Sequence, residues 1–220
     1  MIRAFLAVEL SQELRTKLAT LQQELKLRIE PEMTRDTRIF WVQPDSIHLT
    51  LKFLGDMDEQ MIDPLCAAIE QAIGSQIVVN VPLERLGAFP NSQSPRVLWV
   101  GPSEHWEKGP AAKRLAEIHG AIEQACEGFS FFRETKPFSP HLTLVRIRVK
   151  ERHVGVALAQ SGVLDRPLSS GSLAVESVVL MKSELKPTGS VYTKLWGVRL
   201  TCPSCLFGLF GLSGWSGLFG

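Results

Sequence analysis

The tetrapeptide His-Leu-Thr-Leu occurs twice in this chain of 220 residues, at positions 48–51 and 141–144. The chain has five His and ten Thr, from which chance would give only about 0.2 His-x-Thr triplets. Side chains at i and i+2 share a face of a β-strand, so each copy directs its His and Thr to one face and its two leucines to the other. The fold must therefore contain two strands that each carry a polar His-Thr face backed by an apolar core.

Two interpretations of these repeated histidines are open. Polar residues opposite leucines are common in a half-exposed sheet, and a single histidine in a strand is usually a structural residue. We keep that interpretation for His105, His119 and His153, which have no partner at a meaningful spacing. It does not explain the repetition, whereas two strands that face each other across a cleft would bring two imidazoles to opposite sides of one ligand.

Two histidines on opposite sides of a phosphorus atom can catalyse an in-line displacement. The ordinary pKa of imidazole, ~6.5, allows one ring to act as the base and the other as the acid at neutral pH. The hydroxyls of Thr50 and Thr143 can donate hydrogen bonds to phosphate oxygens, where negative charge accumulates. This chemistry needs no metal ion, and we expect neither a metal nor a cofactor.

Hydrophobic periodicity predicts helices interleaved with short strands. Three helical stripes of apolar residues end at Pro31, Gly74 and Gly128, and a weaker one spans 151–160. Strands are predicted at 3–8, 38–42, 47–54, 77–86, 96–101, 141–148, 172–185 and 190–200.

The turn-like Gln-Pro-Asp-Ser between 38–42 and 47–54 favours a hairpin or an adjacent pair for these two strands. Because most strands return through short turns, the pattern favours α+β with antiparallel sheets over a doubly wound parallel sheet. The order of elements is similar in the two halves, which indicates duplication.

Composition excludes several classes of protein. The 24 Lys and Arg against 23 Asp and Glu give a net charge of +1, so we expect no affinity for duplex DNA or for an anionic membrane. No apolar run reaches the ~18–20 residues that span a bilayer, and the N-terminal apolar run is too short for a secretion signal. Four cysteines do not make a disulfide framework in a chain of this length. We expect a cytoplasmic monomer.

The composition changes after Leu200. Residues 201–220 form a low-complexity tail rich in Gly, Leu and Phe, to which we assign no fold. Cys202 and Cys205 have the spacing of a zinc half-site or a redox pair, but a second such pair is missing from the sequence. An inert pair is the favoured interpretation, and attachment to a membrane or partner is the alternative for the tail.

The chain resembles the RNA 2',3'-cyclic phosphodiesterases, also called the 2'-5' RNA ligase family, of the two-histidine phosphoesterase superfamily. The resemblance covers about residues 2–200 and is carried by RAFLAVEL, WVQPDSIHLTLKFLGD, the stretch from LGAFPN to PRVLWVG, PFSPHLTLVRIR and LMKSELKPTGSVYTKL. It implies one bilobal domain over 1–200, with two pseudo-symmetric lobes, each an antiparallel sheet with flanking helices, around a central cleft.

The resemblance also implies roles for individual residues. His48 would be the proton donor and His141 the proton acceptor, with Thr50 and Thr143 on the phosphate. Arg146 would add a cationic phosphate contact, although strict alternation from His141 places it on the opposite face of the strand unless a bulge intervenes.

The strand pattern adds one more candidate for phosphate binding. Alternation places Lys52 on the face of His48 and Thr50, where it could support substrate binding electrostatically. Trp41, Phe53 and Phe89 could stack a base, although a core position is the expectation for each.

The expected function is metal-independent hydrolysis of the 2',3'-cyclic phosphate at an RNA end, or of a small cyclic nucleotide, to a 2'-phosphate. The same groups run backwards would join a 5'-hydroxyl RNA in a 2'-5' linkage, so ligation is an alternative. A non-catalytic module that binds RNA ends or nucleotides is another, but binding alone does not need two titratable groups.

Overall fold

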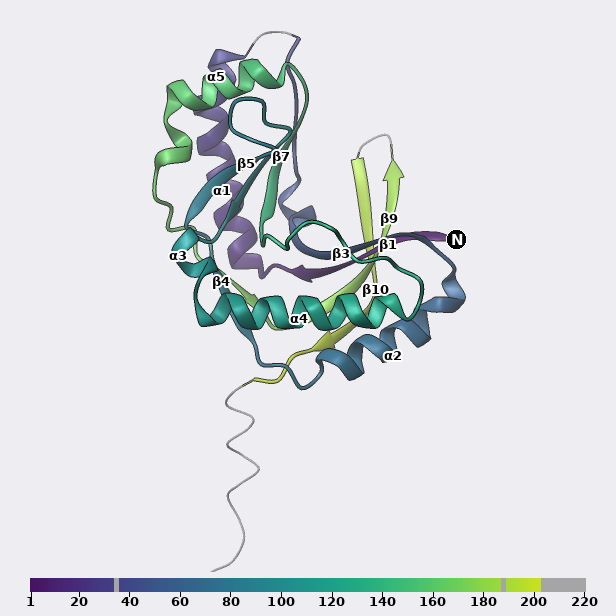
Figure 1. The fold of residues 1–220 in the computed structure, drawn as a ribbon. Helices are drawn as coiled ribbons and strands as arrows, with labels where there is room; N and C mark the ends of the chain where they lie inside the picture. The colour runs from purple at the N-terminus through teal and green to yellow at the C-terminus, as the bar shows by residue number, and fades with distance from the viewer. Residues whose placement is uncertain (34–35, 187–188, 203–220) are drawn as a thin grey trace, which may run out of the picture.

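The computed structural model describes residues 1–33, 36–186 and 189–202 (Figure 1). Within these ranges the chain forms an antiparallel sheet of eight strands and a second sheet of two. The strands of the large sheet follow the order β10-β9-β1-β3-β7-β6-β5, and β2 pairs with β7. Their bounds are β1 Ile2–Glu9, β2 Arg38–Trp41, β3 His48–Met57, β5 Arg85–Phe89, β6 Val97–Gly101, β7 Leu142–Val149, β9 Ser177–Lys186 and β10 Gly189–Arg199. The prediction of an α+β fold with antiparallel sheets is confirmed.

The large sheet divides into two lobes at the junction of β3 and β7. A single residue pair, Leu49 with Leu142, links these two strands. Strands β10, β9, β1 and β3 form one lobe, and β7, β6, β5 and β2 form the other, so that the two parts diverge from the junction (Figure 1). Each lobe takes strands from both halves of the sequence. The lobes are therefore not the two sequence halves whose similar order of elements indicated duplication.

Each lobe has its own pair of long helices. Helices α1 (Gln12–Ile29) and α5 (Glu151–Ser161) pack together beside the lobe of β7, whereas α2 (Ile62–Ile73) and α4 (Pro110–Glu127) pack together beneath the lobe of β3 (Figure 1). A short helix, α3 (Glu104–Glu107), precedes α4.

The ends of these helices agree with the sequence signals. The hydroxyl oxygen of Ser11 caps α1 by accepting a hydrogen bond from the backbone N–H of Leu14 at 3.2 Å. Gly74 and Gly128 end α2 and α4 as predicted. The leucine and isoleucine stripes of α1, α2 and α4 are buried in the core.

Three predicted strand assignments are corrected. The segment before the first histidine does not form a hairpin with β3, because the turn at Pro44–Ser46 carries the chain across the junction and β2 pairs with β7. The predicted strand 77–86 is divided between β4 (Val79–Pro82) and β5, and 172–185 between β8 (Ser172–Val175) and β9. Strands β4 and β8 pair only with each other, as the small second sheet.

The ordered packing continues to the end of the described chain. The backbone N–H of Thr201 donates to the carbonyl of Gln76 at 2.8 Å, and its carbonyl accepts from Val78 at 3.2 Å. Thr201 and Cys202 of the predicted tail are described, whereas 203–220, with Cys205, lies beyond the described residues, as does part of the predicted turn at 186–189. In the segments that are described, no helix is both long enough and apolar enough to cross a membrane.

Candidate active site

The two repeated histidines occupy equivalent positions in the two lobes. His48 begins β3 and His141 directly precedes β7. The Nδ1 atom of His48 lies 2.8 Å from the carbonyl oxygen of Ser46, and the Nδ1 atom of His141 lies 2.8 Å from that of Ser139. A carbonyl oxygen only accepts, so each Nδ1 carries the hydrogen and donates it. Each neutral ring therefore keeps an unprotonated Nε2, the form of imidazole that can take up a proton.

Aromatic rings hold both imidazoles in place. The ring of His48 lies 4.8 Å from that of Phe5 and 5.2 Å from that of Tyr192, between ring centroids. Phe89 meets His141 edge-on at 5.0 Å, and Trp99 lies behind it at 6.1 Å. These contacts fix the planes of both rings and remove much of their surface from water.

This burial changes the proton affinity of both rings. Burial lowers the pKa of His48 from 6.5 to about 4; its hydrogen bond to Ser46 opposes the change, and the charges of Arg146 and His141 reinforce it. Burial also lowers the pKa of His141, again with help from Arg146. Because Arg146 acts on both rings and His141 acts on His48, the three side chains share one electrostatic environment. A bound anion there would favour the protonated form of either histidine.

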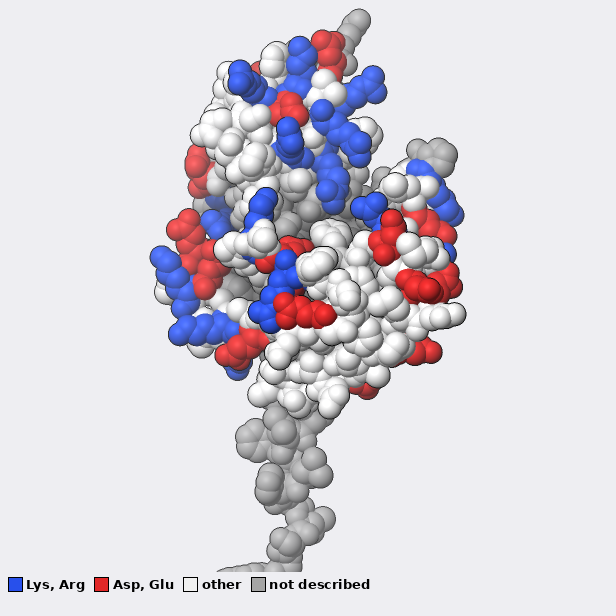
Figure 2. Space-filling view, turned by 45° about the vertical axis from the view of Figure 1, so that its right-hand side comes forward, with Lys and Arg blue, Asp and Glu red and all other residues white. Residues whose placement is uncertain are grey.

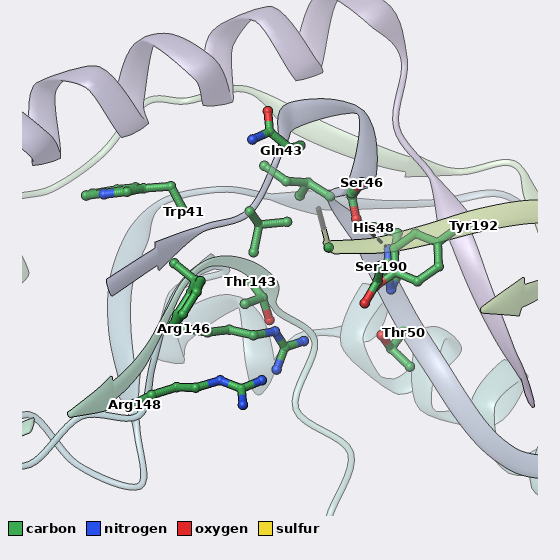
Figure 3. Close-up of a pocket in the computed structure, with 14 residues that line it drawn as sticks. Trp41, Gln43, Ser46, His48, Thr50, Thr143, Arg146, Arg148, Ser190 and Tyr192 are labelled. Carbon is green, nitrogen blue, oxygen red and sulfur yellow. Dashed lines mark hydrogen bonds between the residues drawn. The ribbon is translucent and has the colours of Figure 1, made fainter. Parts of the chain in front are cut away.

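A cavity of about 240 Å³ opens beside His48 (Figure 3). It brings together four of the predicted site residues: His48 and Thr50 from β3, and Thr143 and Arg146 from β7. His141 does not line this cavity but lies two residues before Thr143, directly ahead of β7. The other lining residues are Phe40, Trp41, Val42, Gln43, Ser46, Ile47, Arg148, Gly189, Ser190 and Tyr192. Among the residues described, no Asp or Glu lines it, which suits an anionic ligand.

A β-bulge in β7 explains how Arg146 reaches this cavity. The pairing of β7 with β6 shifts between Thr143 and Val145, so that Leu144 has no partner. Leu144 and Val145 are therefore both buried, and Arg146 emerges on the face of Thr143. The conflict between strict alternation and a phosphate contact by Arg146 is resolved by this extra residue.

Comparisons with known proteins agree with this geometry. The family model described as LigT-like phosphoesterase matches residues 8–99 and 108–192. This chain belongs to the LigT-like phosphoesterase family. It is 28% identical to an RNA 2',3'-cyclic phosphodiesterase of Methanothermobacter thermautotrophicus over 90% of this chain and 99% of the relative.

Two further relatives lead to the same family. An RNA 2',3'-cyclic phosphodiesterase of Thermus thermophilus is 32% identical over 88% of each chain. The structure of E. coli LigT complexed with NADP+ aligns with a TM-score of 0.66 and 25% identity, over 91% of this chain and 98% of that one. The family predicted from the repeated motif is thus confirmed.

Lys52 does not occupy the place that alternation predicts in this LigT-like chain. The pairing of β3 with β1 skips Leu51, so Leu51 and Lys52 are both buried and Phe53 turns to the face of Thr50. The Lys52 ammonium lies 2.8 Å from both carboxylate oxygens of Glu123 on α4, and it is 1% exposed. The prediction that Lys52 contacts substrate from the cleft face is therefore wrong, because a bulge reverses the alternation.

Each bulge is held by a polar side chain from a neighbouring helix. On α1, the Gln22 amide donates to the carbonyl oxygens of Leu144, at 2.9 Å, and Val42, at 2.8 Å. On α4, the imidazole of His119 donates to the backbone of Leu51 and stacks on Phe138 with ring centroids 4.2 Å apart. His119 therefore has the structural role that the sequence favoured.

Several residues that line the cavity were missed by sequence reasoning. Arg148 lies two residues after Arg146 on the same face of β7, a spacing that could have identified it. Ser190 and Tyr192 come from β10, and only the tertiary fold brings them beside His48. The described ranges contain no cluster of three or more His, Cys, Asp or Glu placed to hold a metal ion.

The three aromatic candidates for base stacking lie in different environments. Phe53 is 62% exposed, so its expected core position is wrong. Phe89 packs on His141. Trp41 is half-buried against the core, and its indole N–H donates to Glu30 at 3.0 Å.

Proposed function

We propose that this protein hydrolyses the 2',3'-cyclic phosphate at RNA ends to a 2'-phosphate, by acid-base catalysis with His48 and His141. The observation that carries the proposal is the matched pair of imidazoles, each with Nδ1 bonded to a carbonyl and both within the field of Arg146. Relatives named RNA 2',3'-cyclic phosphodiesterase, which align over most of this chain, support the same reaction.

Substrate binding would use three polar side chains of the cavity. The guanidinium of Arg146 would neutralise the cyclic phosphate, and the hydroxyls of Thr50 and Thr143 would donate to its non-bridging oxygens. The scarcity of negative charge in the cavity supports this assignment. A structure of E. coli LigT complexed with NADP+ supports the idea that such a fold accepts nucleotides.

The proposed bond changes use one ring as the base and the other as the acid. Nε2 of neutral His141 takes a proton from water as the water oxygen attacks phosphorus. The bond from phosphorus to the 3'-oxygen breaks, and Nε2–H of protonated His48 delivers its proton to that oxygen. The product carries a 2'-phosphate and a 3'-hydroxyl, and solvent returns both rings to their starting states.

The acid role of His48 requires the substrate to raise its pKa. With a pKa of about 4, His48 is mostly neutral at pH 7 in the free protein. A phosphate anion between the rings favours the protonated form, so substrate binding would prepare the proton donor. Both limbs of the pH profile of kcat should accordingly lie at higher pH than those of kcat/KM.

The proposal includes the setting of the enzyme. We propose a cytoplasmic monomer that acts on RNA ends or small cyclic nucleotides and not on duplex DNA, which the near-zero net charge supports. The buried free thiols of Cys66 and Cys126 are compatible with a reducing compartment. We propose residues 1–200 as one catalytic domain and 201–220 as a separate tail.

The test uses the full chain and an oligoribonucleotide with a 2',3'-cyclic phosphate end, with EDTA or with added divalent cations. We expect hydrolysis to a 2'-phosphate in both conditions, with the position of the phosphate established by NMR. A 3'-phosphate product, no hydrolysis, or a loss with EDTA that one divalent ion reverses would overturn the proposal. A 5'-hydroxyl oligonucleotide in a parallel reaction measures ligation.

A further inference from the structure

The polar face of β7 continues beyond the residues used for catalysis. From the bulge outward, Arg146 and Arg148 extend side by side into the cavity (Figure 3). Two residues along a strand advance about 6.6 Å, a separation comparable with that of adjacent phosphates in an extended RNA strand. Two cations in this arrangement suit two successive phosphate groups.

An exposed aromatic ring lies beside the second arginine. Phe40 on β2 pairs with Arg146 in the sheet and is 51% exposed. The guanidinium carbon of Arg148 lies 5.6 Å from the centroid of the Phe40 ring, which holds the arginine against one side of the aromatic group. An aromatic surface next to a cation is the arrangement by which proteins bind a base and its phosphate in single-stranded RNA.

The charge of this region is not neutralised by the protein. In the part of the chain that the structure describes, neither Arg146 nor Arg148 has a carboxylate within 4.0 Å, whereas Arg15 and Arg85 both form ion pairs. Figure 2 shows basic side chains gathered on the upper lobe, which in Figure 1 contains β7.

A second cavity on another side of His48 contrasts with this one. It is lined by Glu9 and Asp45 as well as by Arg15 and Lys194. Its carboxylates would repel a phosphate, and ion pairs already occupy its cations. An RNA strand that enters the site is therefore expected to pass over Phe40 and Arg148.

We propose that Phe40 and Arg148 form a subsite for the penultimate nucleotide of the RNA. The base stacks on the Phe40 ring, and the Arg148 guanidinium binds the phosphate that joins this nucleotide to the terminal one. The inference rests on the proposed function, since it takes the cyclic phosphate to lie at His48 and Arg146. It predicts that the protein prefers an oligonucleotide end to a cyclic mononucleotide.

The test compares 2',3'-cyclic AMP with a trinucleotide that ends in a 2',3'-cyclic phosphate. Phe40→Ala and Arg148→Ala should each raise KM for the trinucleotide about 5- to 100-fold and leave the mononucleotide within about 2-fold. Leu27→Ala and Arg199→Ala, at exposed positions outside the cavity, are the matched apolar and charged controls.

Salt dependence separates the two contributions. Arg148→Ala should reduce the slope of log affinity against log salt by about 0.7, the value for one phosphate contact on a single strand, and Phe40→Ala should not change it. The binding arm uses fluorescently labelled trinucleotide with a 2'-phosphate end, and 2'-AMP as its competitor. Equal effects on the mononucleotide and the trinucleotide, or no effect on either, would overturn the subsite. If the protein hydrolysed neither substrate, but the two variants still weakened binding of the trinucleotide and not of 2'-AMP, only the catalytic proposal would be overturned.

Discussion

The two copies of His-Leu-Thr-Leu have the same local backbone geometry but are followed by residues of different chemistry. In both, the histidine donates through Nδ1 to the carbonyl two residues earlier, and a bulge after the threonine buries two consecutive side chains. The exposed residue that follows is Phe53 in β3 and Arg146 in β7. The geometry around the two histidines is therefore duplicated, but of these two residues only Arg146 carries a positive charge.

The buried side chains behind the two bulges differ in the same way. Lys52 is paired with Glu123 in the interior, whereas Val145 at the matching position is surrounded by apolar groups. In the first copy the cation, Lys52, is buried away from the cavity, whereas in the second copy the cation, Arg146, lines it. The comparison shows that the repeated sequence sets the orientation of both histidines but does not set the charge of the residues that follow each copy.

The largest expected effect comes from the feature that the two copies share. His48→Ala and His141→Ala should each lower kcat about 10²- to 10⁴-fold, because each removes one proton-transfer group. Near-equal losses would support a two-histidine mechanism, and a small loss in one variant would mean that its copy is structural. His153→Ala on the surface of α5 is the control, and thermal unfolding verifies that each variant is folded.

The second prediction concerns stability and separates Lys52 from Val145. Lys52→Met removes the ammonium that neutralises the buried Glu123 carboxylate and leaves it with His119 Nε2 at 3.8 Å, so it should lower the free energy of unfolding by about 3–5 kcal/mol. Val145→Ala only removes apolar contacts and should cost about 1–3 kcal/mol. The double variant Lys52→Met with Glu123→Gln should recover most of the loss in urea unfolding. A loss below about 1 kcal/mol for Lys52→Met would mean that the ion pair does not stabilise the fold.

The third prediction tests the positive charge that Arg146 brings to the cavity. Arg146→Ala should lower kcat/KM about 10²- to 10³-fold, the cost of one lost donor to developing phosphate charge, whereas Phe53→Ala should change it less than about 10-fold. Removal of Arg146 should also raise the pKa of both histidines, so the limbs of the kcat/KM profile should move to higher pH. If the limbs of the profile did not move, Arg146 would not contribute to the electrostatic environment of the two rings.

These contrasts also define what the sequence alone could predict. Alternation and repetition were sufficient to place His48, Thr50 and Thr143 in a shared site, because the first residues of each strand precede the bulge. Beyond the bulge, alternation gave the wrong face for Lys52 and the wrong face for Arg146. A bulge depends on partners from other elements, here Gln22 and His119, which no local pattern reveals.

The strand pairing was equally hard to predict. The helix boundaries follow from local signals such as Ser11 and Gly74, and they agree with the structure. The pairing of β2 with β7 depends on contacts between residues about a hundred positions apart, so a turn-like sequence before β3 was misread as a hairpin. Phe40 joins the site through this pairing, and Tyr192 through the pairing of β9, the hairpin partner of β10, with β1.

The smallest expected effect compares the two histidines through stability at low pH. A histidine whose folded pKa lies below its unfolded value contributes stability above the unfolded pKa, and this contribution is lost as the pH falls toward the folded value. For His48 the interval runs from about 6.5 to about 4, so the free energy of unfolding should decrease there by at most about 3 kcal/mol. His48→Gln should remove this decrease, and urea unfolding at pH 7.5, 5.5 and 4.5 measures it.

His141→Gln should act in the same direction and less strongly. Both Arg146 and His141 oppose protonation of His48, whereas Arg146 is the charge that opposes protonation of His141. His119, whose pKa is also lowered by burial, is unchanged in both variants and contributes equally to each curve. A larger effect for His141→Gln would reverse the order of the two pKa values. It would make His141 the ring that is harder to protonate in the free protein, which would agree with its proposed role as the base.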